Sequence, residues 1–231
     1  MPKREEVRRK RKKNSQSSNL TVILIIAAFA IVAVGMVVLS QIKATPKVTM
    51  PERTLAAQRD GLSMGDPNAK VKVTEFADFQ CPACVSYWSE LEPTIIQNYI
   101  DTGKVYFTYN PFSFLGQGQA WDESSKAAEA AYCANEQNNF WEFRDLIFAN
   151  HNGENQGVYT HDVLVAYAKQ LGLDTKAFTA CFDSGKYTQK VVDDANFAAS
   201  VGATFTPSFL VDGQVLNANE LLPKIEELLN K

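Results

Sequence analysis

The fold is decided by one stretch of the chain, Glu75-Phe76-Ala77-Asp78-Phe79-Gln80-Cys81-Pro82-Ala83-Cys84. Its first residues, 75–79, complete a run typical of a strand, residues 71–79. After the second cysteine, over residues 85–99, apolar side chains recur at helical spacing. Unpaired backbone N–H groups and the positive end of the helix dipole favour a thiolate at such a junction. Because a thiolate both attacks and leaves in disulfide exchange, the spacing predicts a redox-active pair, Cys81 and Cys84.

The first forty residues have the pattern of a membrane anchor. Residues 1–19 hold eight Lys or Arg and two Glu, a net charge of +6 that leaves −9 for the rest of the chain. Residues 20–40 are almost wholly apolar, and about 20 residues rising about 1.5 Å each span a bilayer core of roughly 30 Å. No A-x-A cleavage pattern follows, although cleavage after Ala44 stays open. We therefore expect a basic cytoplasmic tail, a transmembrane anchor at 20–40, and all later residues outside the cytoplasm.

The remaining chain is expected to hold one folded domain. Residues 41–62 are weakly patterned and contain two prolines, so we interpret them as a tether. Residues 63–231 are numerous enough for a well-packed core. Their acidic balance argues against a nucleic-acid partner, because phosphates require a basic face. A compartment outside the cytoplasm permits disulfides, which suits a chain with four cysteines.

The expected order of elements is strand, helix, strand, helical block, hairpin and helix. A second strand is expected at 105–109, and a helical block follows it. Residues 205–211 return to a strand, Asp212-Gly213 signals a hairpin, and residues 219–230 have the pattern of an amphipathic helix. Because apolar residues occupy both faces of the first strand, we expect that strand to be central and covered on both sides.

This order and its motifs resemble the DsbA-like thiol–disulfide oxidoreductases of the thioredoxin superfamily, in their membrane-anchored form. The motifs are the stretch quoted above and Gly202-Ala203-Thr204-Phe205-Thr206-Pro207-Ser208-Phe209, and the segments Phe140-Trp141-Glu142-Phe143 and Leu171-Gly172-Leu173-Asp174 are also similar. The resemblance covers residues 63–231. It implies an α/β protein, a thioredoxin fold with an inserted helical domain at about 112–201, preceded by a single N-terminal transmembrane helix. It implies no cofactor and no metal.

The resemblance also assigns roles to residues outside the cysteine pair. It implies a cis bond between Thr206 and Pro207 that faces the cysteines and turns the Thr206 backbone toward an extended substrate; an ordinary trans proline is the alternative. It places a buried acid at Glu75, beneath the pair, to relay a proton to or from Cys84. A partly solvated strand glutamate is the alternative there.

The other two cysteines, Cys133 and Cys181, fall in separate expected helices. A bridge between them would stabilise the fold by about 4 kcal/mol through the entropy of the unfolded chain. We therefore predict a structural disulfide, with two buried free thiols as the alternative. For Cys81 and Cys84 the alternatives are a zinc site, which lacks a second close-spaced ligand pair in the sequence, and a purely structural disulfide of little entropic benefit.

The expected function is the oxidation of protein thiols to disulfides outside the cytoplasm, with unfolded or reduced secreted proteins as substrates. The resemblance implies a quinone-coupled membrane partner, DsbB-like or similar to vitamin K epoxide reductase, that reoxidises the pair. Ala83 stands where the best-known members carry histidine, so we expect a reduction potential between about −120 mV and −270 mV. A disulfide reductase or isomerase with the same site stays open, as does a tethered binding or holdase module with structural cysteines.

Overall fold

The computed structural model describes residues 24–33 and 48–231. The chain divides into two compact units, residues 1–45 and 46–231. In the first unit, residues 24–33 form a helix with exposed side chains. The other parts of the expected tail, anchor and early tether, residues 1–23 and 34–47, lie outside the described residues. Among the helices that are described, none combines the length and the apolar character needed to cross a membrane.

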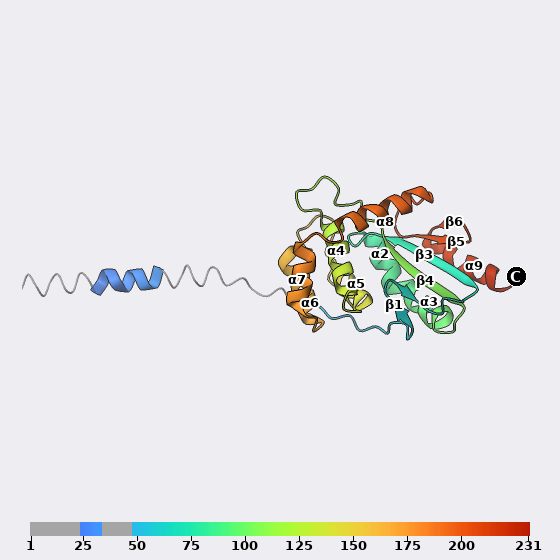
Figure 1. Ribbon diagram of the computed structural model, residues 1–231, viewed down its shortest axis with the longest axis horizontal. Helices are drawn as coiled ribbons and strands as arrows, with labels where there is room; N and C mark the ends of the chain where they lie inside the picture. The colour runs from blue at the N-terminus through green and yellow to red at the C-terminus, as the bar shows by residue number, and fades with distance from the viewer. Residues whose placement is uncertain (1–23, 34–47) are drawn as a thin grey trace, which may run out of the picture. The chain divides into compact units, whose positions relative to one another are not determined.

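A six-stranded sheet forms the centre of the second unit (Figure 1). Its strands are β1 (Arg59–Asp60), β2 (Ser63–Met64), β3 (Val71–Ala77), β4 (Val105–Pro111), β5 (Ser208–Val211) and β6 (Gln214–Leu216). They stand in the order β1-β2-β4-β3-β5-β6. Strand β3 pairs in parallel with β4 and antiparallel with β5, which makes it central. Strands β5 and β6 form the predicted hairpin, with Asp212 and Gly213 at positive φ in its turn.

Strand β3 is covered on both faces, as its apolar pattern predicts. Val71 and Val73 belong to the main core, together with the helices after the cysteine pair and helix α9 (Ala218–Leu229). Phe76 points to the opposite face and packs in a second cluster with Ala198 of helix α8 (Thr188–Ser200). The strand that leads to the cysteines is therefore held between two layers of helices.

A long helical run follows the cysteine pair. It consists of α2 (Pro82–Ser86), the π-helical segment η1 (Tyr87–Leu91), α3 (Glu92–Ile95) and the π-helical segment η2 (Ile96–Ile100). The sequence predicts an irregularity at Pro93, which has no N–H to donate. The structure shows it as the π-helical turn directly before α3.

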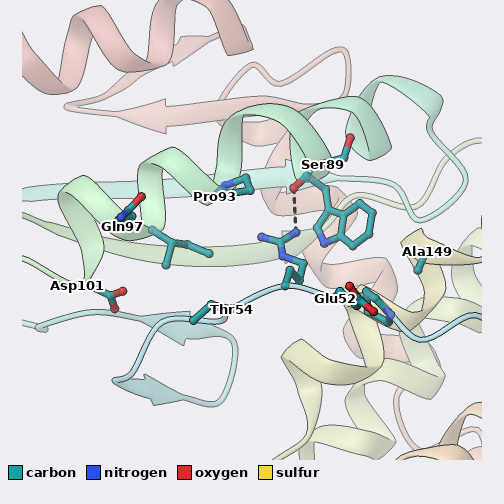
Figure 2. A pocket seen from close by; sticks show the side chains of 11 residues that line it. Glu52, Thr54, Ser89, Pro93, Gln97, Asp101 and Ala149 are labelled. Atoms are coloured by element: carbon teal, nitrogen blue, oxygen red, sulfur yellow. Dashed lines mark hydrogen bonds between the residues drawn. The ribbon is translucent and has the colours of Figure 1, made fainter.

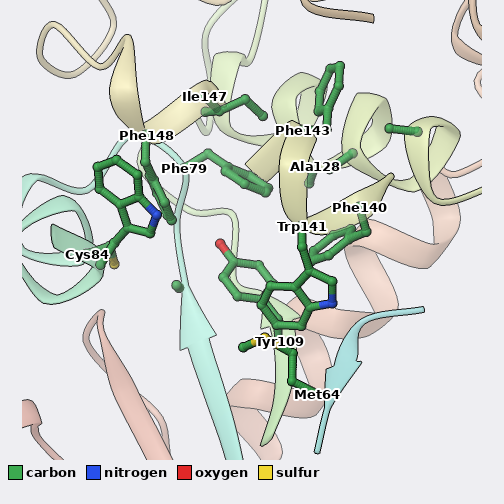
Figure 3. Packing of buried hydrophobic residues seen from close by; sticks show 14 of the residues in the cluster. Met64, Phe79, Cys84, Tyr109, Ala128, Phe140, Trp141, Phe143, Ile147 and Phe148 are labelled. Atoms are coloured by element: carbon green, nitrogen blue, oxygen red, sulfur yellow. The ribbon is translucent and has the colours of Figure 1, made fainter. Parts of the chain in front are cut away.

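The helical insertion lies between β4 and β5. Its helices are α4 (Glu123–Asn135), α5 (Phe140–Ala149), α6 (His161–Gln170) and α7 (Thr175–Asp183), followed by α8. Asp174 caps α7 by accepting hydrogen bonds from the backbone N–H groups of Lys176 and Ala177. Phe140 and Phe148 of the insertion belong to the same buried cluster as Cys84 (Figure 3). The sheet and the insertion thus share one core that contains the second cysteine of the pair.

The structure differs from the sequence prediction at the start of the folded unit. Residues 41–62 are predicted as a tether, yet residues 48–62 pack against the domain. The backbone of Thr49 exchanges hydrogen bonds with the side chain of Asn150 at 2.7 and 2.9 Å. Strands β1 and β2 extend the edge of the sheet. Strands of two residues are too short to show an alternating pattern, which explains why the sequence does not reveal them.

Candidate active site

The cysteine pair lies at the start of helix α2. Cys81 is the N-cap residue, and Pro82 is the first residue of the helix, where an N–H would have no partner within the helix. The backbone carbonyl of Cys81 accepts a hydrogen bond from the Val85 N–H at 3.2 Å and so closes the first turn. Cys81 is 8% exposed, Cys84 is fully buried, and both thiols are free. An external sulfur therefore reaches the pair at Cys81.

The environment of Cys81 favours its thiolate. The pKa of the Cys81 thiol is lowered to about 6, chiefly by the hydrogen bond from the Cys84 side chain. The Thr206 hydroxyl and the backbone N–H groups of Ala83 and Cys84 act in the same direction, while burial opposes them. In the described part of the chain the Thr206 hydroxyl oxygen is buried and has no hydrogen-bond partner, so it stays available to the Cys81 sulfur. At pH 7, such a pKa keeps the thiolate about tenfold more abundant than the thiol.

Cys84 is shifted in the opposite direction. Burial raises its pKa well above the ordinary value, and the hydrogen bond to Cys81 and the nearby charges of Cys81 and Glu75 add to this effect. Cys84 therefore holds its proton at neutral pH. The pair combines a nucleophilic thiolate that is slightly exposed with a protonated thiol that is fully buried.

The Thr206–Pro207 segment faces the pair across the site. The peptide bond between these two residues is cis, and the Thr206 carbonyl oxygen lies 3.4 Å from Cys81 Sγ. A groove of about 460 Å³ adjoins the pair, lined by the start of the helical run, by residues 205–207 and by the start of α9. Phe205 is 42% exposed beside it. The groove offers a backbone edge and an apolar surface next to the reactive sulfur, which suits an extended peptide.

Glu75 lies on β3, in register with Tyr109 of β4 and Phe209 of β5. Its side chain is buried, so the alternative of a partly solvated glutamate does not apply. Burial and the nearby Glu92 raise the pKa of Glu75 to about 8, against the opposing effect of Arg144 and Arg53. Because its charge also helps to raise the pKa of Cys84, Glu75 is electrostatically coupled to the pair. At neutral pH, Glu75 is a protonated acid that is electrostatically coupled to a buried thiol.

Asp78 is a structural residue of the site that the sequence pattern does not single out. Its carboxylate accepts hydrogen bonds from the backbone N–H groups of Phe114 and Leu115 at 2.8 and 3.0 Å, and from the Ser124 hydroxyl at 2.6 Å. Burial raises its pKa, while these hydrogen bonds oppose the rise. Asp78 therefore ties the loop before α4 to the active-site turn. The signal that could have identified Asp78 in the sequence is a carboxylate between the apolar residues Ala77 and Phe79.

Gln80, in the active-site turn, and His151, in the insertion, connect these two parts of the domain. The Gln80 amide donates to the Ser124 hydroxyl at 2.8 Å. The Nε2 atom of His151 lies 2.8 Å from the Gln80 carbonyl oxygen, directly before Cys81. His151 is one of two histidines in the chain, and its position in a loop gave no sign of this contact.

Cys133 and Cys181 form a disulfide between α4 and α7, with their Cα atoms 5.9 Å apart. Both residues are buried in the insertion, as part of the main core. Within residues 24–33 and 48–231, no group of three or more His, Cys, Asp or Glu side chains is placed to hold a metal ion.

Comparisons with known proteins identify the family of the chain. The family model described as Thioredoxin matches residues 56–231. The chain is 32% identical over 157 residues to the probable disulfide bond formation protein D of Bacillus cereus, a match that covers 67% of this chain and 71% of that protein. It is 25% identical over 169 residues to disulfide bond formation protein D of Bacillus subtilis, covering 73% and 75%. The fold is similar to the crystal structure of oxidised BdbD from Bacillus subtilis, with a TM-score of 0.66, 24% identity, and coverage of 78% of this chain and 100% of that one. The chain therefore belongs to the thioredoxin superfamily and, within it, to the DsbA-like protein-disulfide oxidoreductases, with Cys81 and Cys84 as its CxxC motif.

Proposed function

We propose that the protein donates disulfides to protein substrates, with Cys81 and Cys84 as the exchanging pair. The observation that carries this proposal is the unequal acidity of the two thiols, with a pKa of about 6 for Cys81 and a pKa well above the ordinary value for Cys84. A stabilised Cys81 thiolate is a good leaving group and stabilises the reduced form of the pair. Both effects make the oxidised pair a stronger oxidant.

The exchange proceeds in two steps. A substrate thiolate attacks Cys81 Sγ, the bond between Cys81 and Cys84 breaks, and Cys84 leaves with the bonding electrons and takes up a proton. The second substrate thiolate then attacks the substrate sulfur of the mixed disulfide, and Cys81 leaves as its stabilised thiolate. Two electrons pass from the substrate dithiol to the pair, and the substrate gains a disulfide.

Two neighbours of the pair have roles in this proposal. Glu75 supplies the proton that Cys84 takes up on leaving, because it is buried, protonated at neutral pH and coupled to that thiol. The Thr206 backbone, which the cis bond to Pro207 directs at the site, aligns an extended substrate segment beside Cys81. A Glu75→Gln variant that keeps the wild-type exchange rate and pH profile would remove Glu75 from the mechanism.

The proposed setting is outside the cytoplasm, with residues 20–40 as the membrane anchor and residues 1–19 on the cytoplasmic side. The net positive charge of residues 1–19 and the apolar side chains of residues 20–40 support this placement. Unfolded or reduced secreted proteins are the proposed substrates. A quinone-coupled membrane protein, DsbB-like or similar to vitamin K epoxide reductase, is the proposed reoxidant of the reduced pair.

The test is the reduction potential of the Cys81–Cys84 pair in the full chain, equilibrated in glutathione buffers. We expect a value well above the roughly −200 mV of glutaredoxins, which establishes a net disulfide donor. A value near the roughly −270 mV of thioredoxin would turn the assignment to a reductase. If a folded Cys81→Ala variant kept full function, the site would be structural, and a binding or holdase role would replace the redox one.

A further inference from the structure

Five charged side chains meet in the core of the second unit. They are the carboxyl groups of Glu75, Glu92 and Asp145 and the guanidinium groups of Arg53 and Arg144. The side chain of Arg53 is 10% exposed, and the other four are 3% exposed or less. We call this group the buried charge cluster. In a core of this kind, every charge that lacks a partner is strongly disfavoured.

Two of the three carboxyl groups are paired with both arginines. Glu92 accepts two hydrogen bonds from Arg144, at 2.6 and 2.8 Å, and one from Arg53 at 2.6 Å. Asp145 accepts hydrogen bonds from Arg144 at 2.8 and 3.1 Å and from the Trp88 indole N–H at 2.8 Å. Arg53 Nε also lies 3.4 Å from Asp145 Oδ2. Each of these two carboxylates therefore contacts both guanidinium groups.

Glu75 is left at the edge of this arrangement. Its Oε2 atom lies 4.0 Å from Arg144 Nη1 and has no hydrogen-bond partner among the described residues. Cys84, Tyr87 and Tyr109 also interact with Glu75, and burial raises the pKa of all three so that they stay neutral. Two positive charges thus balance two carboxylates, and a third negative charge would have no counterpart. The charge count matches a protonated Glu75.

Arg53 reaches this cluster from outside the thioredoxin core. It belongs to the segment before β1, which also contacts the helical run through a hydrogen bond from the Ala57 N–H to Asp101 at 3.1 Å. Arg53 Nη1 donates to the Trp88 carbonyl oxygen at 2.8 Å, the bond drawn as a dashed line in Figure 2. A cavity of about 860 Å³ lies between this segment and the helical run (Figure 2). The second positive charge of the cluster therefore depends on a residue that precedes the family match at residue 56.

We propose that Arg53 is a positioning residue that keeps both Glu92 and Asp145 ionised and thereby makes Glu75 the one carboxyl group of the buried charge cluster that carries a proton. Without Arg53, one guanidinium faces two carboxylates, and one of them must take up a proton. Asp145 is the expected acceptor, because burial already raises its pKa, whereas the two arginines lower that of Glu92. In the wild type the proton is confined to Glu75, the side chain that is electrostatically coupled to Cys84.

The consequence for the reaction rests on the proposed function. When Cys84 leaves as a thiolate, the proton moves from the Glu75 carboxyl oxygen to Cys84 Sγ, and Glu75 becomes a carboxylate that solvent reprotonates. If Asp145 held a second proton, the cluster would contain two competing acids. Arg53 thus acts on the exchange through Glu75 and touches neither the substrate nor the cysteines.

The experiment counts protonated carboxyl groups in the full chain by infrared spectroscopy, with ¹³C-carboxyl label placed in either glutamate or aspartate. In the wild type we expect one protonated glutamate signal that titrates near pH 8 and is absent from Glu75→Gln. Arg53→Met should add one protonated aspartate signal at pH 7, and Arg53→Lys, which keeps the charge, should not. Arg59→Met is the matched control, because Arg59 pairs with Glu142 at a partly exposed site.

The outcomes separate this proposal from the proposed function. A folded Arg53→Met chain with no protonated aspartate, or a wild type with no protonated Glu75, would overturn the role of Arg53. If Arg53→Met does not fold, the double variant Arg53→Met with Asp145→Asn removes one charge of each sign, and it must keep the wild-type glutamate signal; loss of that signal overturns the proposal. Should the charge count hold while the cysteine pair shows no reversible two-electron transition, only the proposed function fails.

Discussion

Replacing Glu75 with glutamine should make the protein more stable at neutral pH, in contrast to most substitutions of buried residues. In the unfolded chain Glu75 ionises near its ordinary pKa of 4.5, whereas burial raises the pKa in the folded chain to about 8. Between these two values the folded state binds more protons than the unfolded state. The free energy of unfolding therefore falls as pH rises, by about 1.4 kcal/mol per pH unit from this single group.

The size of the effect follows from the two pKa values. From pH 4.5 to pH 7 the wild type should lose about 3 kcal/mol of stability through Glu75, and above pH 8 the loss stops growing because both states are ionised. Glutamine has the same shape and cannot ionise. The Glu75→Gln variant should thus resemble the wild type at pH 4.5 and exceed it by about 3 kcal/mol at pH 7.

The assay is urea denaturation of both chains at several pH values from 4.5 to 8, with the cysteine pair held in the same redox state throughout. The difference between the two chains cancels the contributions of all other titrating groups. Glu90→Gln, at an exposed position of the helical run, is the matched control for replacing a glutamate with glutamine at the surface. If the stability curves of wild type and Glu75→Gln ran parallel from pH 4.5 to 7, Glu75 would not be the buried, protonated acid described here.

Three other results are expected. The thiolate absorbance of Cys81 should titrate with a midpoint near pH 6, and Thr206→Val should move that midpoint upward because the hydroxyl favours the thiolate; a wild-type midpoint at the ordinary thiol value would contradict this. Cys133→Ser should lower the free energy of unfolding by about 4 kcal/mol, since the bridge closes a loop of 48 residues; equal thermal melting without reductant would show that the bridge contributes nothing. Asp78→Asn should cost about 1–3 kcal/mol and speed amide hydrogen exchange at Phe114 and Leu115, and unchanged exchange there would refute its role in holding the loop.

The sequence predicts the reactive pair and the order of elements because both depend on local patterns. A CxxC motif at a strand–helix junction restricts the chemistry, and the periodicity of the apolar residues places β3, the helical block and the hairpin. The Thr-Pro motif gained its meaning from the family resemblance, since an isolated X-Pro pair gives no sign of its isomer.

The buried charge cluster could not be predicted in the same way. Arg53 and Glu92 are 39 positions apart, and Glu92 and Arg144 are 52 apart, so only the tertiary fold brings them together. Each of these residues has the character of an ordinary surface charge in its own segment. The segment that carries Arg53 also lacks periodicity, and for that reason the tether was predicted to extend over it.

The complete burial of Cys84 means that the protein itself sets the lifetime of the mixed disulfide. A thiol in the core meets few external sulfurs, but it lies beside Cys81 at a high effective concentration that no dilution changes. A substrate held on Cys81 without a ready second thiol is therefore released by Cys84 at a first-order rate, set by the protein and independent of how much substrate is present. The site thereby limits how long a slow or misfolded client can occupy it.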